Sequence, residues 1–339
     1  MAIRLINGFA GYAGGASAQR QAKVPPTRLD DGDFSVPVNL TAAAVLNPDD
    51  AAPLNSDALK NPLGVPLRIH ELKWSLQTSP GVDSQDNVNI YLLSGLAVEA
   101  AIALGVNPIT NTTVPLYNFG PTLEPEVEIG GHTYTGTNFS GQVFGVWKFD
   151  EPWYLLPGEG PNIQLKHRSL VSSVINVTVS LAGTPVCDLP KKHSLPFVSS
   201  YTASPIQLDT TSTDLTRQST ERDLVNPLPV PVRARRFVGR LSVVSNPDAN
   251  TVYVDGNTRH VVRDALINMT MRDSQGTPTV KDSTPFGAVF PIPTHSIEIP
   301  HIITPGSYYI ATLKGTVMKA SDNIKAHPSI SIIGYRDIA

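Results

Sequence analysis

The sequence contains few cysteines, few charged residues and no long apolar run. Its single cysteine, Cys187, excludes an internal disulfide framework and a cysteine-based zinc site, and we expect it to be a small buried or half-buried residue. No run of about 18 apolar residues occurs, so no segment is expected to span a membrane. The apolar stretch within residues 1–15 is short and interrupted by Asn7 and several glycines, which is not typical of a secretion signal.

Charged residues make up only 16% of the chain, whereas 30 prolines and 25 glycines are present. Frequent turn-forming residues with few charged runs predict many short strands joined by turns. The hydrophobic fraction of 41% is ordinary for a globular protein and argues against wholesale disorder. A length of 339 residues suits two domains of roughly 100–200 residues each.

The net charge of −3 argues against a general nucleic-acid binder, and we expect no specific nucleic-acid site. Residues 1–190 hold 10 basic and 17 acidic residues, a charge of −7, whereas residues 191–339 hold 16 basic and 12 acidic residues, a charge of +4. Halves of opposite sign would attract each other in an assembly. Chance divergence of solvated faces is the other interpretation, because single surface charges contribute little.

An internal repeat is the most informative feature of the sequence. LKNPLGVPLR at residues 59–68 returns as LVNPLPVPVR at residues 224–233, with seven identical positions and an offset of 165. Upstream, residues 36–40 match residues 204–208 at an offset of 168. Downstream, residues 154–158 match 302–306, and 165–166 match 313–314, both at an offset of 148. Three collinear matches predict a duplicated domain.

Most repeated segments are expected to be strands. In Val174–Leu181 apolar and polar residues alternate, which is typical of a strand with one buried face. Pro157-Gly158 and Pro305-Gly306 predict the same tight turn in both copies. A helix is expected at Leu96–Leu104, from its Ala, Leu and Glu content. The expected strands are Phe34–Leu40, Leu67–Leu76, Val88–Leu93, Gln142–Phe149, Asn162–Lys166, Val174–Leu181, Phe237–Val244, Thr251–Val254, Ala265–Met271, Ser296–Ile299, Tyr308–Lys314 and Ser329–Gly334.

The sequence therefore predicts an all-β protein of two tandem jelly-roll β-sandwich domains with few short helices. We expect a flexible N-terminal arm at residues 1–28, a first jelly roll at 29–187, a linker at 188–203 and a second jelly roll at 204–339. The arm holds four basic residues and no acidic one, so ordering on assembly and simple terminal disorder are both open.

Motifs for catalysis are absent from the sequence. It contains no P-loop, no Gly-x-Ser-x-Gly and no His-Glu-x-x-His. A duplicated cupin, which is also a jelly roll, would need His-x-His, and no two of the eight histidines are separated by a single residue. We therefore expect no catalytic, cofactor-binding or metal-binding residues and no enzyme. The histidines are His70, His132, His167, His193, His260, His295, His301 and His327.

Three groups of residues allow a functional interpretation beside a structural one. Asp30, Asp31 and Asp33 could bind Ca²⁺ or form a solvated turn. A basic cluster could contact nucleic acid or an acidic neighbour, or form a polar strand face or a subunit contact. The three tryptophans could form a carbohydrate platform, but buried core aromatics are the commoner outcome. The basic cluster is Arg233, Arg235, Arg236 and Arg240, and the tryptophans are Trp74, Trp147 and Trp153.

Two collinear sandwich domains, the repeated blocks at 59–68 and 224–233, and the repeated Pro-Gly turns resemble the double jelly-roll major capsid proteins of tailless, membrane-containing bacteriophages and their adenovirus-like relatives. The resemblance is architectural and covers residues from about Phe34 to Ile338. It implies a homotrimer that forms a pseudo-hexameric capsomer and tiles an icosahedral virion shell, assembled in the host cytoplasm. The implied partners are the chain itself, neighbouring capsomers, minor capsid and penton proteins, and an internal lipid membrane. A viral spike, tail or carbohydrate-binding β-sandwich is the alternative.

Overall fold

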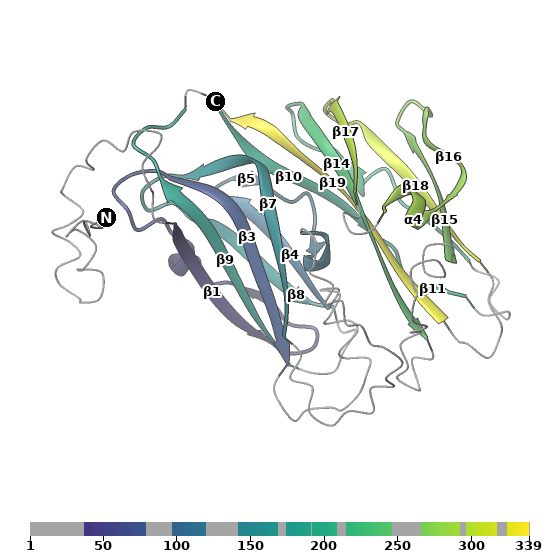
Figure 1. Ribbon diagram of the computed structural model, residues 1–339, viewed down its shortest axis with the longest axis horizontal. Coiled ribbons are helices and arrows are strands. Elements are labelled where there is room, and N and C mark those ends of the chain that lie inside the picture. Colours follow the sequence, from purple (N-terminus) through teal and green to yellow (C-terminus); the bar gives the residue numbers. More distant parts are fainter. Residues whose placement is uncertain are drawn as a thin grey trace, which may run out of the picture.

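The computed structural model describes residues 37–78, 97–119, 142–168, 174–190, 192–208, 215–245, 266–291, 296–316 and 324–338. These residues form four antiparallel sheets that pack as two sandwiches lying side by side (Figure 1). The sandwiches follow one another along the chain, the first from β1 to β9 and the second from β10 to β19.

The first sandwich has one sheet in the order β1-β9-β3-β7 and a second in the order β2-β8-β4-β5, with β6 also paired to β4. Two short 3-10 helices, η2 and η3, lie between its strands. The bounds are β1 Val38–Leu46, β2 Ala51–Pro53, η2 Ser56–Leu59, β3 Leu67–Thr78, β4 Val98–Leu104, β5 Asn107–Pro108, β6 Val114–Pro115, η3 Leu116–Asn118, β7 Gln142–Leu155, β8 Pro161–His167 and β9 Ile175–Pro185.

The second sandwich has one sheet in the order β10-β19-β14-β17, with β11 also paired to β19. Its other sheet has the order β12-β18-β15-β16, with β13 also paired to β18. The bounds are β10 His193–Thr202, β11 Ile206–Gln207, β12 Thr216–Gln218, β13 Leu224–Val225, β14 Val232–Ser245, β15 Ile267–Asp273, β16 Pro278–Pro285, α4 Phe286–Val289, β17 Ser296–Ile303, β18 Tyr308–Gly315 and β19 Ile324–Ile338.

The two sandwiches share one topology. When the eight strand positions of each are numbered in chain order, one sheet reads 1-8-3-6 and the other 2-7-4-5 in both sandwiches. We call the 1-8-3-6 sheet the major sheet. Its third strand has an irregularity in register between Ile69 and Glu71 in the first sandwich, and between Ala234 and Arg236 in the second, again at an offset of 165. Two eight-stranded double-sheet sandwiches of this kind are jelly rolls, which confirms the predicted fold class.

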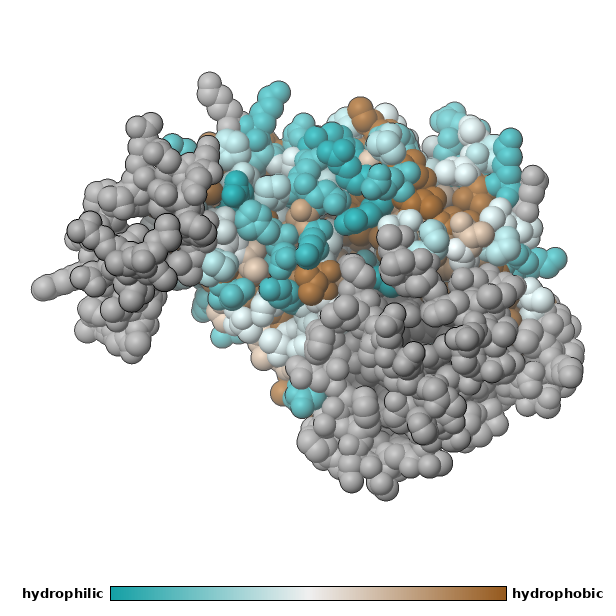
Figure 2. Space-filling model, in the orientation of Figure 1, coloured by the Kyte–Doolittle hydropathy of each residue, from teal (hydrophilic) through white to brown (hydrophobic). Residues whose placement is uncertain are grey.

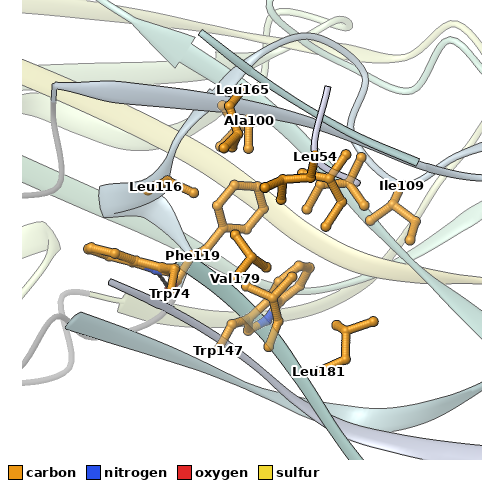
Figure 3. Close-up of a cluster of buried hydrophobic side chains, with 14 of the residues drawn as sticks. Leu54, Trp74, Ala100, Ile109, Leu116, Phe119, Trp147, Leu165, Val179 and Leu181 are labelled. Carbon is orange, nitrogen blue, oxygen red and sulfur yellow. Dashed lines mark hydrogen bonds between the residues drawn. The ribbon is translucent and has the colours of Figure 1, made fainter. Parts of the chain in front are cut away.

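Each sandwich has its own hydrophobic core. In the first, Trp74, Phe119 and Trp147 lie among buried aliphatic side chains (Figure 3). Trp74, Trp147 and Trp153 are each only 1% exposed. Four residues of the second sandwich also pack into this first core, so the two domains share buried surface at their contact. These residues are Leu195, Val198, Val238 and Ile333.

The helix expected at Leu96–Leu104 is wrong, because residues 98–104 form strand β4. Buried residues alternate strictly with half-buried ones along β4, and the strand pairs with β8 over its whole length. The helix propensity of its three alanines is outweighed because Val98, Ile102 and Leu104 fit the alternating face of a sheet that covers the core.

The upstream repeat match at an offset of 168 is also wrong. In the major sheets, Val38 pairs with Gly183 and Phe197 pairs with Gly334, so the structural counterpart of β1 is β10. The expected linker at 188–203 therefore contains the first strand of the second sandwich. The error arose because alternating strands resemble one another in many registers, so a five-residue match does not fix the alignment.

Several expectations lie outside the described residues. These are the N-terminal arm, the three aspartates at 30, 31 and 33, and the strands expected at Val88–Leu93 and Thr251–Val254. Positions 34–36 of the strand expected at Phe34–Leu40 also lie outside the described residues. Strand β1 continues beyond Leu40 through Thr-Ala-Ala-Ala, a run that has low β propensity by composition.

Candidate functional site

The repeated block of the first sandwich places one buried asparagine at the centre of a backbone network. Asn61 is 1% exposed, and its side-chain nitrogen donates to the carbonyls of Val65 and Leu155, both at 2.9 Å. Its side-chain oxygen accepts from the amide of Leu63 at 3.0 Å. Its backbone carbonyl accepts from the Gly158 amide at 2.9 Å. The two sequence blocks that define the repeat therefore contact each other directly.

The second sandwich repeats this network. Asn226 is fully buried and donates to the carbonyls of Val230 at 3.0 Å and Ile303 at 2.9 Å. Its side-chain oxygen accepts from the Leu228 amide at 3.1 Å, and its carbonyl accepts from the Gly306 amide at 2.8 Å. We call each of these networks an asparagine clamp. It joins the segment before the third strand to the turn after the sixth.

The Pro-Gly turns held by the clamps have the predicted geometry. Gly158 has a φ of 78° and Gly306 a φ of 76°, both in the left-handed region that favours glycine. A side-chain carbon added at either glycine would have no atom within 4 Å. Backbone conformation, rather than space, therefore explains why glycine recurs at these two positions.

A buried polar cluster joins the two sandwiches. Asn118, at the end of η3, has no exposed surface, and its side-chain nitrogen lies near three serine hydroxyls of the second sandwich. The distances are 3.1 Å to Ser200, 2.7 Å to Ser329 and 2.7 Å to Ser331. These serines lie on β10 and β19, on the outer face of the second major sheet. Nearby, Thr110 forms an isolated parallel bridge with Val198.

Acidic residues of the first sandwich meet the arginine cluster of the second. The Glu151 carboxylate pairs with Arg233 at 2.9 Å and with Arg235, and it accepts from the Ser194 hydroxyl at 2.7 Å. Asp150 pairs with Arg236 at 3.4 Å. We call these contacts, together with the Asn118 cluster and the four shared core residues, the junction.

The charges of the junction stabilise the ionised form of Glu151. Burial by itself would raise the pKa of this carboxyl, but the hydrogen bond from Ser194 and the guanidinium groups of Arg235 and Arg233 outweigh it, so the pKa is lowered. The hydroxyl of Tyr335 also lies at the junction, where it accepts from the Asp150 amide at 2.8 Å. Burial raises the pKa of Tyr335 to about 12, so this hydroxyl stays neutral.

The structure resolves two of the open interpretations. Three members of the arginine cluster contact acidic neighbours within the same chain, and the fourth, Arg240, is 1% exposed. All three tryptophans are buried, so they form no exposed carbohydrate platform. Cys187 is half-buried, as expected.

Sequence reasoning did not single out Asn61, Asn226, Asn118 or Glu151. The two clamp asparagines were visible as identical positions in the repeat, and an asparagine retained before a proline in both copies was a usable signal. Nothing in the sequence marked Asn118 or Glu151, because their partners lie far away along the chain, in the second sandwich.

Within the described part of the chain, no group of three or more histidine, cysteine, aspartate or glutamate side chains is placed to hold a metal ion. Among the same residues, no helix is long and apolar enough to cross a membrane. An open polar pocket of about 370 Å³ lies on the second sandwich, where the Tyr308 hydroxyl donates to Glu221 at 3.0 Å beside Arg272 and Asp273. On the face of the molecule shown in Figure 2, apolar patches lie between hydrophilic areas of the described surface.

No family model matches the sequence, and no curated protein matches it in a sequence comparison. Several solved structures are similar in fold. The major capsid protein of STIV is 12% identical, with 87% of this chain and 96% of that chain covered and a TM-score of 0.41. The major capsid protein P2 from bacteriophage PM2 is 9% identical, with 89% and 98% covered and a TM-score of 0.37. PNGase F, a glycosylasparaginase from Flavobacterium meningosepticum, is 10% identical, with 91% and 100% covered and a TM-score of 0.30. At these values the likeness describes the fold and assigns no activity.

Proposed function

We propose that the chain is a non-enzymatic viral major capsid protein that forms homotrimers. Each trimer would be a pseudo-hexameric capsomer that tiles an icosahedral virion shell. Its principal partner is the chain itself, first within the trimer and then in neighbouring capsomers. Contacts with minor capsid or penton proteins and with an internal membrane belong to the same proposal.

One observation carries this proposal. The chain holds two jelly rolls of identical strand order, joined by a buried junction rather than by a free linker. Three such chains around a threefold axis present six similar units, which gives a near-hexagonal outline from a closed trimer. A rigid junction matters here, because independently moving domains would not present fixed edges to neighbouring subunits.

The alternative, a spike, tail or carbohydrate-binding protein, is favoured by one observation, the polar pocket beside Tyr308. Such a protein would bind a glycan through a few convergent polar groups. The burial of all three tryptophans counts against this reading. A glycan array with the wild-type chain and a Tyr308→Ala variant tests it, and pocket-dependent binding is the result that would favour it.

The proposal is tested by the oligomeric state and by particle formation. Sedimentation velocity and light scattering at micromolar concentration should give the mass of a trimer. We expect such a stable trimer to bury an interface above roughly 2,000 Å². Electron microscopy of the same sample should show near-hexagonal particles or tiled sheets. A monomer at these concentrations would contradict the proposal.

A further inference from the structure

We infer that the outer face of the first major sheet, on β1 and β9, is the docking surface for the second sandwich of another copy of this chain. The partner contributes the side of its second sandwich that carries α4 and β17. This inference rests on the proposed function and adds the surface through which the trimer closes. It follows from a comparison of the outer face of the major sheet in the two sandwiches. In the second sandwich this face is already covered by the first sandwich of the same chain.

The covered copy is the outer face of the second major sheet, which the first sandwich occupies at the junction. Strand β10, the edge strand of that sheet, is buried along residues 195–201. Its Ser200 hydroxyl lies against the Asn118 side chain, and Ser331 on β19 completes the contact. A jelly roll of this chain can therefore bind the side of another jelly roll on this face.

The same hydroxyl pair exists, uncovered, on the first sandwich. Residue pairing in the major sheets makes Thr41 the counterpart of Ser200 and Ser180 the counterpart of Ser331. The hydroxyls of Thr41 and Ser180 lie 2.8 Å apart on an exposed surface, whereas those of Ser200 and Ser331 lie 2.9 Å apart in a buried one. The binding groups are thus duplicated, and only the first pair lacks an occupant within the described chain.

Strand β1 also has the properties of an edge that requires a neighbour. It pairs with β9 over nine residues without any shift in register, and it contains no charged residue. Its outward side chains include Ala43 and Val45, and Val45 is 60% exposed. Natural sheets protect free edges with charges, prolines or bulges, because a regular apolar edge invites association. Unprotected β1 therefore fits a surface that is covered in the assembled state.

The side chains of the two outer faces differ in a way that agrees with when each face is covered, one during folding and the other on assembly. Val198, Val238 and Ile333 pack into the first core at the junction. Their counterparts on the first sandwich are Asn39, Lys73 and Ala182. A contact made during folding can bury several large apolar side chains, whereas a face that meets water before assembly is expected to carry fewer of them.

The second sandwich offers a matching side. Helix α4 lies where η3 lies in the first sandwich, since each follows a proline, Pro285 or Pro115, that pairs with the fourth strand. Ala288 is the exposed residue of α4, two positions after its first residue, as Asn118 is in η3. A small residue at this point leaves space for the bulkier Thr41 in place of Ser200.

Strand β17 adds a charge and an apolar side chain to this side. Ile302 is 62% exposed, and Glu298 is exposed and forms no ion pair among the described residues. Glu298 lies opposite Arg236 in the second major sheet, at the register position that Lys148 holds opposite Glu71 in the first. The face proposed to receive Glu298 carries Lys73 and Lys148, whose side chains are 47% and 79% exposed. Both lysines lie near one carboxylate, that of Glu71, at 3.2 and 4.0 Å, so two cations share a single acid there. The expected contact therefore joins an acid to a lysine-bearing face.

The first test adds charge to the proposed surface. We expect Thr41→Glu combined with Ala43→Glu to raise the dissociation constant of the trimer by about 100-fold, because two carboxylates would be buried opposite α4 without a partner of opposite charge. Sedimentation velocity over a dilution series measures this change. The matched control is Gln164→Glu with Lys166→Glu, two exposed positions on β8 of the other sheet, which should leave the trimer intact.

The outcomes separate this inference from the proposed function. A wild-type monomer contradicts the proposed function, and the docking surface with it. A wild-type trimer that dissociates no more readily when Thr41 and Ala43 carry glutamates leaves the proposed function standing and overturns the docking surface. Circular dichroism spectra of the variants establish that their sheets are intact.

A cross-linking experiment decides the matter even if the charged variant misfolds. Thr41→Cys combined with Ala288→Cys should give covalent dimers and trimers with a short bismaleimide, because the corresponding pair within the chain, Ser200 and Asn118, lies 3.1 Å apart. The two single variants control for the native Cys187 and should give only monomers. A trimeric double variant that yields no covalent dimer would refute the proposed surface.

Discussion

Asn61 and Asn226 form the same hydrogen bonds in the two sandwiches, whereas the outer faces of the two major sheets carry different side chains. The clamps face identical surroundings in both copies, because each ties the same turn to the same strand entry. The outer faces of the two major sheets have different surroundings. That of the second sandwich lies against the first sandwich, whereas that of the first sandwich is exposed to solvent in the single chain. Duplicated elements have therefore stayed alike where their neighbours are alike, and have diverged where their neighbours differ.

The clamps provide the largest expected effect. Asn61→Ala or Asn226→Ala would leave two carbonyls and one amide without their partner, in buried or partly buried positions, at a cost of about 3–5 kcal/mol of unfolding free energy each. Urea unfolding measures the loss, and the exposed Asn162→Ala serves as control. A large loss for one asparagine with almost none for the other would break the equivalence of the two copies.

The junction asparagine should have the next largest effect. Asn118→Ala removes an amide that lies within 3.1 Å of three serine hydroxyls, and we expect a loss of about 2 kcal/mol. Differential scanning calorimetry should show the lower stability, together with weaker coupling between the transitions of the two sandwiches. Thr112→Ala, an exposed change in the same region, should alter neither. Unchanged coupling in the Asn118 variant would show that the apolar contacts alone hold the junction.

The two Pro-Gly turns allow a finer comparison. Gly158→Ala and Gly306→Ala should each cost about 1–2 kcal/mol, because alanine is strained at a positive φ even where space is free. Thermal unfolding measures both. Asparagine tolerates this backbone region better, so Gly158→Asn and Gly306→Asn should lose less. Equal losses for alanine and asparagine would point to a cause other than backbone conformation.

The smallest effect at neutral pH is expected from Glu151→Gln, since partly exposed ion pairs contribute less than about 1 kcal/mol. The folded-state pKa of Glu151 lies below its ordinary value, so its contribution is complete above that ordinary value and is lost as the pH falls through the folded pKa. The stability difference between the wild type and the variant should therefore shrink below about pH 4.3. Unfolding at a series of pH values tests this, with the exposed Asp188→Asn as control. A difference that grows on acidification would contradict it.

Fold class and duplication were readable from the sequence because both leave local signals. The Asn-Pro-Leu blocks and the Pro-Gly turns are backbone requirements, and they recur wherever the same turn recurs. The identity of β4 as a strand was not readable from propensity, because Leu, Ala and Glu favour a helix locally and only the pairing with β8 decides otherwise. The start of the second sandwich was missed for a similar reason, since β10 is defined by its partner β19, more than 120 residues later.

The residues of the candidate site were harder to foresee. Arg233, Arg235 and Arg236 stood out as a basic cluster, but their partners Asp150 and Glu151 are ordinary acidic residues in the sequence. Asn118 becomes distinctive only once η3 lies against β10 and β19. Contacts between domains depend on how whole sheets are placed, and no short pattern in the chain records that placement.

The position of β19 has a consequence for biosynthesis. This strand follows every other described strand along the chain, yet it lies between β10 and β14 in the middle of its sheet. The first sandwich has all its strands once β9 has emerged from the ribosome, but β10 and β14 must wait for residues 324–338 before their sheet can form. We therefore expect nascent chains to carry a folded first domain beside an unfinished second one, so that premature termination within the last strand would release a half-folded polypeptide unable to take part in assembly.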